Sequence, residues 1–187
     1  LTDYSKLDRK EQYHYFWQAL LQFRETYKRP PIPQSEADAQ KIVQIATRIA
    51  SACKSKVKIN SELISLLAKP AAGNINPIAA FVGGTVAQEI IKATSSKYTP
   101  IHQFFYFDCL ECMDSTPLTP EDCAPINSRY DGQIAVFGRQ FQKQIQLSHY
   151  LLVGAGAIGC EMLKNWAMMG VGTDPTGLVE VTDMDTI

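Results

Sequence analysis

The sequence lacks the features that mark several large classes of protein. No apolar run approaches the roughly 20 residues that a membrane-spanning helix needs, and no signal-peptide pattern opens the chain. Its 18 Lys and Arg are balanced by 19 Asp and Glu, without a basic block. This charge balance argues against a nucleic-acid partner held through phosphate contacts. We therefore expect neither a membrane nor a nucleic acid as partner.

Cysteine and histidine are too few and too scattered for a clear metal site or disulfide framework. The five cysteines are odd in number and irregularly spaced, which indicates a reducing compartment. Cys109 and Cys112 have the C-x-x-C spacing of half a zinc site or of a redox pair. Zinc would need two further ligands, and only Cys123 lies nearby, while a redox pair should begin a helix rather than follow a strand. We interpret these cysteines as structural and expect no metal.

The first third of the 187 residues has the pattern of a small helical bundle. Asp8 and Glu11 resemble a capping box that opens a helix running to about Tyr27, and the prolines at 30, 31 and 33 end it. A second helix is predicted to begin at Ser35, and a third to follow Asn60. Apolar residues recur at helical spacing in all three and predict one core: Tyr13, Phe16, Trp17, Leu20, Leu21, Phe23, Ile42, Ile45, Ala46, Ile49, Cys53, Leu63, Leu66 and Leu67.

The middle of the chain predicts a helix rich in small residues and then a strand. Asn76 followed by Pro77 predicts a capped helix start, and the helix should run to about Ala93. Gly83 and Gly84 each cost about 1 kcal/mol in a helix, so we expect close approach to another element at a domain contact. The alternative is an ordinary kinked helix. A strand is predicted over 103–107, a loop over 113–127 and a short helix over 128–138.

The C-terminal part carries the most specific pattern. An apolar strand at 151–153 runs into glycines 154, 156 and 159, which have the G-x-G-x-x-G spacing. In that motif the first glycine makes a tight turn, the second lets phosphates approach the backbone, and the third lets the helix pack against the strand. Asp183 ends a second apolar strand, 24 residues after Gly159, where a carboxylate can accept a hydrogen bond from a ribose hydroxyl. The sequence therefore predicts a nucleotide-binding βαβ unit.

Several separate motifs together resemble the family of ubiquitin-activating enzymes. They are NSRYDGQIAVFG from Asn127, VGAGAIGCEMLKN from Val153, VTDMDTI from Val181, NPIAAFVGG from Asn76 with AQE from Ala87, and YFD and LEC between Tyr106 and Cys112. The resemblance covers nearly the whole chain. It implies an α/β fold, in which a helical-bundle insertion precedes parts of two Rossmann-like adenylation domains of the ThiF/MoeB type, the second truncated.

The resemblance also implies domains, ligands and partners. The bundle insertion would be 1–70, the C-terminal part of an inactive adenylation domain 71–124, and the N-terminal part of the active one 125–187. The cofactor-binding site would consist of five residues: the backbone of Ala157 would contact ATP, Asp183 would bind its ribose, and Gly154, Gly156 and Gly159 would shape the loop. The residue that binds Mg²⁺, the residues that clamp the phosphates and the catalytic cysteine would all lie outside this chain. No catalytic residue is therefore expected within it. The expected partners are ubiquitin and ubiquitin-conjugating enzymes, and the expected location is cytoplasmic and nuclear.

The reaction implied by the resemblance is ATP-dependent activation of ubiquitin, first by adenylation of its C-terminus and then by thioester formation. Because the first residue is Leu and the last strand has no following helix, we expect a piece of a longer chain that is inactive alone. Two alternatives stay open. The glycine pattern with Asp183 also fits an NAD-dependent oxidoreductase, and the family also includes activating enzymes for other ubiquitin-like modifiers.

Overall fold

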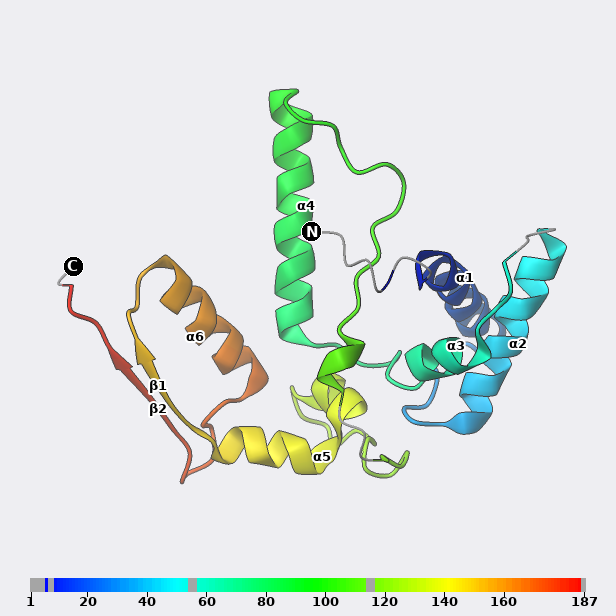
Figure 1. Cartoon of the computed structure of the whole chain (residues 1–187). Coiled ribbons are helices and arrows are strands. Elements are labelled where there is room, and N and C mark those ends of the chain that lie inside the picture. The colour runs from blue at the N-terminus through cyan, green and yellow to red at the C-terminus, as the bar shows by residue number, and fades with distance from the viewer. Residues whose placement is uncertain (1–5, 7–8, 54–56, 114–116, 186–187) are drawn as a thin grey trace. The chain divides into compact units, whose positions relative to one another are not determined.

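The computed structural model describes residues 6, 9–53, 57–113 and 117–185 (Figure 1). The chain forms two compact units. One unit contains Leu1–Gly73 with Tyr106–Ala124, and the other contains Asn74–Phe105 with Pro125–Ile187. These spatial units do not test the domain boundaries inferred from the sequence, which stay a prediction.

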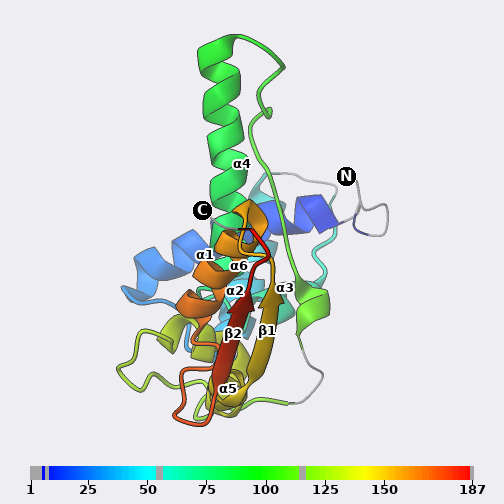
Figure 2. The same ribbon diagram turned by 90° about the vertical axis from the view of Figure 1, so that its left-hand side faces the viewer.

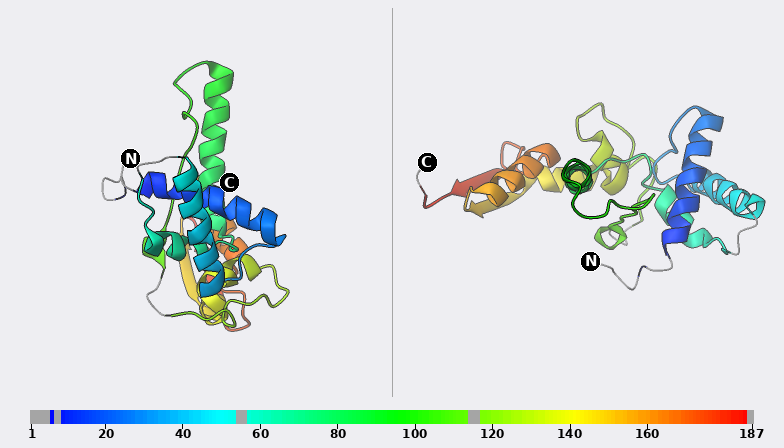
Figure 3. Two further views of the ribbon diagram at one scale, coloured as in Figure 1. Left: turned by 90° about the vertical axis from the view of Figure 1, so that its right-hand side faces the viewer. Right: turned by 90° about the horizontal axis from the view of Figure 1, so that it is seen from above.

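The first unit is built on three packed helices, α1 (Arg9–Tyr27), α2 (Glu36–Ala52) and α3 (Ser61–Ala68), which Figure 3 shows from two sides. Ser35 and Asn60 cap α2 and α3 by accepting hydrogen bonds from the backbone N–H groups of Asp38 and Leu63, as the sequence predicted. Asp8, the expected cap of α1, lies outside the described residues. The core consists of Phe16, Ala19, Leu20, Phe23, Ala39, Ile42, Ile45, Ala46, Ile64 and Ala68.

Four residues expected in this core are exposed instead. Trp17 and Leu21 on α1 are 51% and 61% exposed, because the buried stripe passes through Phe16 and Leu20 and leaves the next position along the helix outside. On α3, Leu66 is exposed and Ile64 takes the buried position. Cys53 follows the end of α2 and is also exposed.

A buried carboxylate links the start of α2 to the proline segment. Asp38 accepts hydrogen bonds from both terminal nitrogens of Arg29 at 2.6 and 3.0 Å, from Lys41 at 3.1 Å and from the backbone N–H of Ile32 at 3.0 Å. The guanidinium of Arg29 holds the pKa of Asp38 far below its usual range, although burial alone would raise it. The carboxylate therefore stabilises the turn at 30–35 as well as the helix.

The second unit contains α4 (Asn76–Ser95) and α5 (Asp131–Leu147). Ile75 rather than Asn76 is the N-cap of α4, so the predicted start was one residue late. A Cβ added at Gly83 or Gly84 would meet nothing within 4 Å of the described structure. The proposed close contact at these glycines therefore stays a prediction. The short helix expected at 128–138 begins three residues later, at Asp131, and continues as the longer α5, which bends at Gly138, where φ is 79°.

The strand predicted over 103–107 is absent from the described residues, and this prediction was wrong. Gln103 has a φ of 64°, in the left-handed region, and the N–H of Phe104 donates to the carbonyl of His102 at 2.9 Å. The backbone therefore turns where a strand would extend. Farther along, Leu110–Cys112 form a short 3-10 helix, η2.

The predicted βαβ unit is present. Strand β1 (His149–Val153) and strand β2 (Leu178–Thr182) pair in parallel, with Leu152 opposite Val181, and α6 (Ala157–Met169) connects them (Figure 2). The buried side chains of Gln133 and Gln142, on either side of the α5 bend, both donate to the carbonyl of Met169 at the end of α6. They fix the bent helix to the crossover helix.

No helix in the described ranges combines the length and apolar character needed to cross a membrane.

Replacing Asp38 with Asn should destabilise the helical unit by about 1.5–3 kcal/mol at neutral pH, because the amide cannot replace the charged hydrogen bonds. The folded pKa of Asp38 lies below the unfolded value of about 3.9, so its contribution is complete above that pH and is lost as the pH falls. Chemical unfolding between pH 7 and 2 should show a weaker pH dependence for D38N than for the wild type. Glu36→Gln, an exposed control on the same turn, should change stability by less than about 0.5 kcal/mol. Equal stability of D38N and wild type at pH 7 would contradict this assignment.

The two-stranded sheet should exchange its amide hydrogens readily. Leu151 and Val153 are 61% and 72% exposed, and a sheet of two strands is marginal alone. We expect protection of the amides of β1 and β2 to be about a hundredfold lower than in α1 and α2, as measured by hydrogen exchange with mass spectrometry. Protection equal to that of the helical core would refute the expectation.

Candidate functional site

The turn after β1 begins at a glycine in a conformation that other residues rarely adopt. Gly154 has a φ of 95°, and its N–H donates to the carbonyl of Thr182 at 2.8 Å. The hydrogen bond continues the pairing of the two strands by one residue, while the positive φ turns the chain toward α6. This arrangement agrees with the tight-turn role predicted for the first glycine.

The third glycine of the motif lies where the helix crosses closest to the strand. Gly159 is buried, and a Cβ added to it would overlap the carbonyl oxygen of Gly154 and lie 3.5 Å from the side chain of Leu152. The backbone of Gly154, which faces this position, cannot move aside as a flexible side chain would. Only glycine therefore permits this approach of α6 to the turn.

The second glycine, in contrast, faces open space. Gly156 is the N-cap of α6, and a Cβ added to it would meet nothing within 4 Å. The helix starts at Ala157 without a side-chain cap, and its first turn contains no acidic residue. The N–H groups of Gly156 to Gly159 have no intrahelical acceptor by the geometry of an α-helix. The helix start therefore offers donors and a partial positive charge to an anion.

Asp183 follows β2 directly and turns its carboxylate to this loop. One oxygen accepts a hydrogen bond from the N–H of Ala155, and the other accepts from the N–H of Asp185 at 2.8 Å. The hydrogen bond from Asp185, followed by that from Ala155, lowers the pKa of Asp183, so the carboxylate is ionised at neutral pH. The structure thus brings together the acid and the glycine loop, 24 residues apart from Gly159 to Asp183.

Ala155 is the residue that sequence reasoning missed. Its N–H binds Asp183, and its carbonyl lies 3.0 Å from the Sγ of Cys160. No residue type marks this role, because it depends on backbone groups alone. From the sequence alone, Cys160 near the start of this helix is expected to be a packing residue rather than a nucleophile. In the described structure it is exposed, and its thiol contacts the loop.

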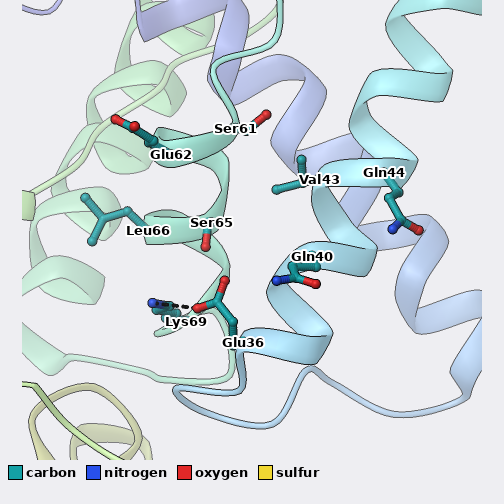
Figure 4. A pocket seen from close by; sticks show the side chains of 9 residues that line it. All are labelled: Glu36, Gln40, Val43, Gln44, Ser61, Glu62, Ser65, Leu66 and Lys69. Atoms are coloured by element: carbon teal, nitrogen blue, oxygen red, sulfur yellow. Dashed lines mark ion pairs between the residues drawn. The ribbon is translucent and has the colours of Figure 1, made fainter.

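A separate groove lies between α2 and α3 in the helical unit (Figure 4). It has a volume of about 680 Å³, and an ion pair of 3.0 Å joins Lys69 and Glu36 at its edge. Its other lining residues are mostly polar, and none belongs to the predicted nucleotide site. We assign no ligand to this groove.

The described residues contain no group of three or more His, Cys, Asp or Glu placed to hold a metal ion. Cys109 and Cys112 lie at the two ends of η2, and Cys123 is buried in the same unit.

Comparisons with known proteins agree with this arrangement. The family model described as "Ubiquitin-activating enzyme E1 four-helix bundle" matches residues 1–50, and the ThiF family model matches residues 130–187. Over its full length the chain is 50% identical to ubiquitin-like modifier-activating enzyme 1 of Mus musculus, of which it covers 18%. Over 99% of its length it is 47% identical to ubiquitin-activating enzyme E1 1 of Schizosaccharomyces pombe, again covering 18%. The corresponding enzyme of Arabidopsis thaliana is 45% identical over the full chain, which spans 17% of it.

The two glycines at the start of α6 should respond differently to alanine. Gly159→Ala should destabilise the second unit by about 1–3 kcal/mol, because the new methyl group overlaps backbone. Gly156→Ala, the matched control, should stay within about 0.5 kcal/mol of wild type, because its methyl group enters open space. Thermal unfolding combined with hydrogen exchange of α6 measures both changes. Equal effects of the two substitutions would show that the close approach at Gly159 is not as described.

Proposed function

This chain belongs to the ubiquitin-activating enzyme family, and from that premise we propose that its βαβ unit forms the beginning of an ATP-binding adenylation site. The observation that carries the proposal is the placement of Asp183 against a glycine loop that opens an uncapped helix. Such a loop binds the phosphates of a nucleotide, and an acid at the end of the second strand binds its ribose.

The residues present fit the phosphates of a nucleotide. Gly156 leaves space beside the backbone, so a phosphate oxygen can approach the N–H groups of Ala157 and its neighbours. No carboxylate in the first turn of α6 would repel it. Gly154 and Gly159 shape the loop without contacting the ligand, since one makes the turn and the other the close packing.

Asp183 fits the ribose. A carboxylate oxygen has more than one acceptor site, so Asp183 can accept from a ribose hydroxyl while the backbone N–H groups of Ala155 and Asp185 hold it in place. Its ionised state makes the hydrogen bond charge-assisted and therefore stronger than one between neutral groups. Two backbone donors orient the acid before the nucleotide arrives.

We infer that the parent enzyme uses this site to activate ubiquitin. The C-terminal carboxylate of ubiquitin attacks the α-phosphate of ATP, pyrophosphate leaves, and a cysteine thiolate of the enzyme then captures the adenylate as a thioester. Ubiquitin-conjugating enzymes receive the product. The support is the family membership, and the chain contributes the adenosine side of the site. Mg²⁺, when bound, neutralises phosphate charge, and we expect its protein ligand in another part of the enzyme.

The relatives favour this function over the alternative of an NAD-dependent oxidoreductase, since their names state modifier or ubiquitin activation. Ubiquitin is the proposed substrate. Measuring exchange of pyrophosphate into ATP with ubiquitin alone, and then with each other modifier alone, identifies the modifier that the enzyme activates. We also propose a cytoplasmic and nuclear location, supported by the resemblance alone and testable by fluorescence microscopy of the tagged parent.

Asp183→Asn in the full-length parent should raise the KM for ATP by about tenfold to a hundredfold, since a hydrogen bond to a charged group contributes about 1.5–3 kcal/mol. The measurement is ubiquitin-dependent exchange of pyrophosphate into ATP. Glu180→Gln removes the same charge from an exposed position on β2 and should leave the KM unchanged. An unchanged KM in D183N, or an equal rise in E180Q, would remove Asp183 from the ribose site.

A further inference from the structure

Cys109 and Cys112 are held at opposite ends of one tight turn. The N–H of Cys112 donates to the carbonyl of Cys109 at 2.9 Å. The short helix η2 begins directly after Cys109 and ends at Cys112. Residues joined by such an i to i+3 hydrogen bond have Cα atoms less than about 7 Å apart, and disulfides bridge Cα atoms about 4.4–6.8 Å apart. The backbone therefore already has the separation that a disulfide requires.

Polar side chains of α1, together with Lys6 just before that helix, anchor this turn. Asp108 accepts hydrogen bonds from Tyr13, from Lys6 at 3.3 Å and from the backbone N–H of Leu110 at 3.2 Å. Within the turn, Glu111 pairs with Lys6 at 2.8 Å and with Arg9 at 3.4 Å. Residues on both sides of Leu110 are thus fixed to the same helix, which maintains the spacing of the two cysteines.

The two thiols differ in their surroundings. Cys112 is exposed, whereas Cys109 is partly buried. Burial, with smaller contributions from the neighbouring Cys112 and Asp108, raises the pKa of Cys109. The thiolate is the nucleophile in disulfide exchange, so the exposed Cys112 is suited to react first with a dissolved disulfide and Cys109 to act second.

A strand directly before Cys109 would disfavour a redox pair, because such a pair should begin a helix. That strand does not exist among the described residues, where a turn at Gln103 replaces it. The pair instead stands at the beginning and end of a hydrogen-bonded turn, so its C-x-x-C spacing is available for a disulfide.

We propose that Cys109 and Cys112 form a reversible intramolecular disulfide by exchange with a low-molecular-weight disulfide such as oxidised glutathione. The Cys112 thiolate attacks one sulfur of that disulfide, forms a mixed disulfide and releases one thiolate. Cys109 then gives its proton to solvent, and its sulfur attacks the Sγ of Cys112 and displaces the second thiolate. The two cysteines are oxidised, and one small disulfide is reduced to two thiols.

The test equilibrates the 187-residue chain with oxidised and reduced glutathione at several ratios, quenches with acid and alkylates the remaining thiols. Intact mass should decrease by two hydrogen atoms as the buffer becomes more oxidising, and peptide mapping should place the bond between Cys109 and Cys112. Added dithiothreitol should restore both thiols to full alkylation.

Three variants make the assignment specific. Cys53→Ser with Cys160→Ser removes two exposed thiols and should leave the bond intact. Cys109→Ser should stop at a stable glutathione adduct on Cys112, and Cys112→Ser should abolish the internal bond. The proposal is overturned if the bond maps to another cysteine such as Cys123, if it persists in C109S, or if the wild type carries only mixed disulfides in the most oxidising buffer.

Discussion

The candidate nucleotide site depends on the contact between the backbone of Gly159 on α6 and the carbonyl of Gly154 at the end of β1. This contact allows no side chain, and it sets how closely the helix start approaches the strand ends. Because β2 pairs with β1 in a defined register, the same contact determines where Asp183 meets the loop. The acid, the loop and the helix start are therefore positioned by backbone geometry.

The helical unit is stabilised differently. Its core is a set of aliphatic and aromatic side chains from α1, α2 and α3, and burial of apolar area supplies most of its stability. Its polar anchors are two carboxylates with several donors each, Asp38 at the start of α2 and Asp108 before η2. Burial alone would raise the pKa of Asp108, but its hydrogen bonds and the charge of Lys6 lower this pKa overall. Asp108 and Asp38 are therefore both ionised in the folded protein at neutral pH.

Features that depend on a few neighbouring residues could be predicted from the sequence. The caps at Ser35 and Asn60, the proline break and the glycine loop are of this kind, because a side chain and a nearby backbone group determine them. Features that depend on partners far away in the sequence could not be predicted in this way. The phenylalanines at 104 and 105 have strong strand propensity, yet a strand needs neighbours and the backbone turns at Gln103. The exposure of Trp17 and the hydrogen bond from Ala155 to Asp183 likewise follow from tertiary packing, which local patterns do not encode.

A crystal structure of the full-length parent enzyme with ATP bound would test the nucleotide site most directly. We expect a ribose hydroxyl within hydrogen-bond distance of the Asp183 carboxylate and phosphate oxygens facing the N–H groups at the start of α6. A nucleotide bound elsewhere, with Asp183 contacting only Ala155 and Asp185, would contradict this expectation.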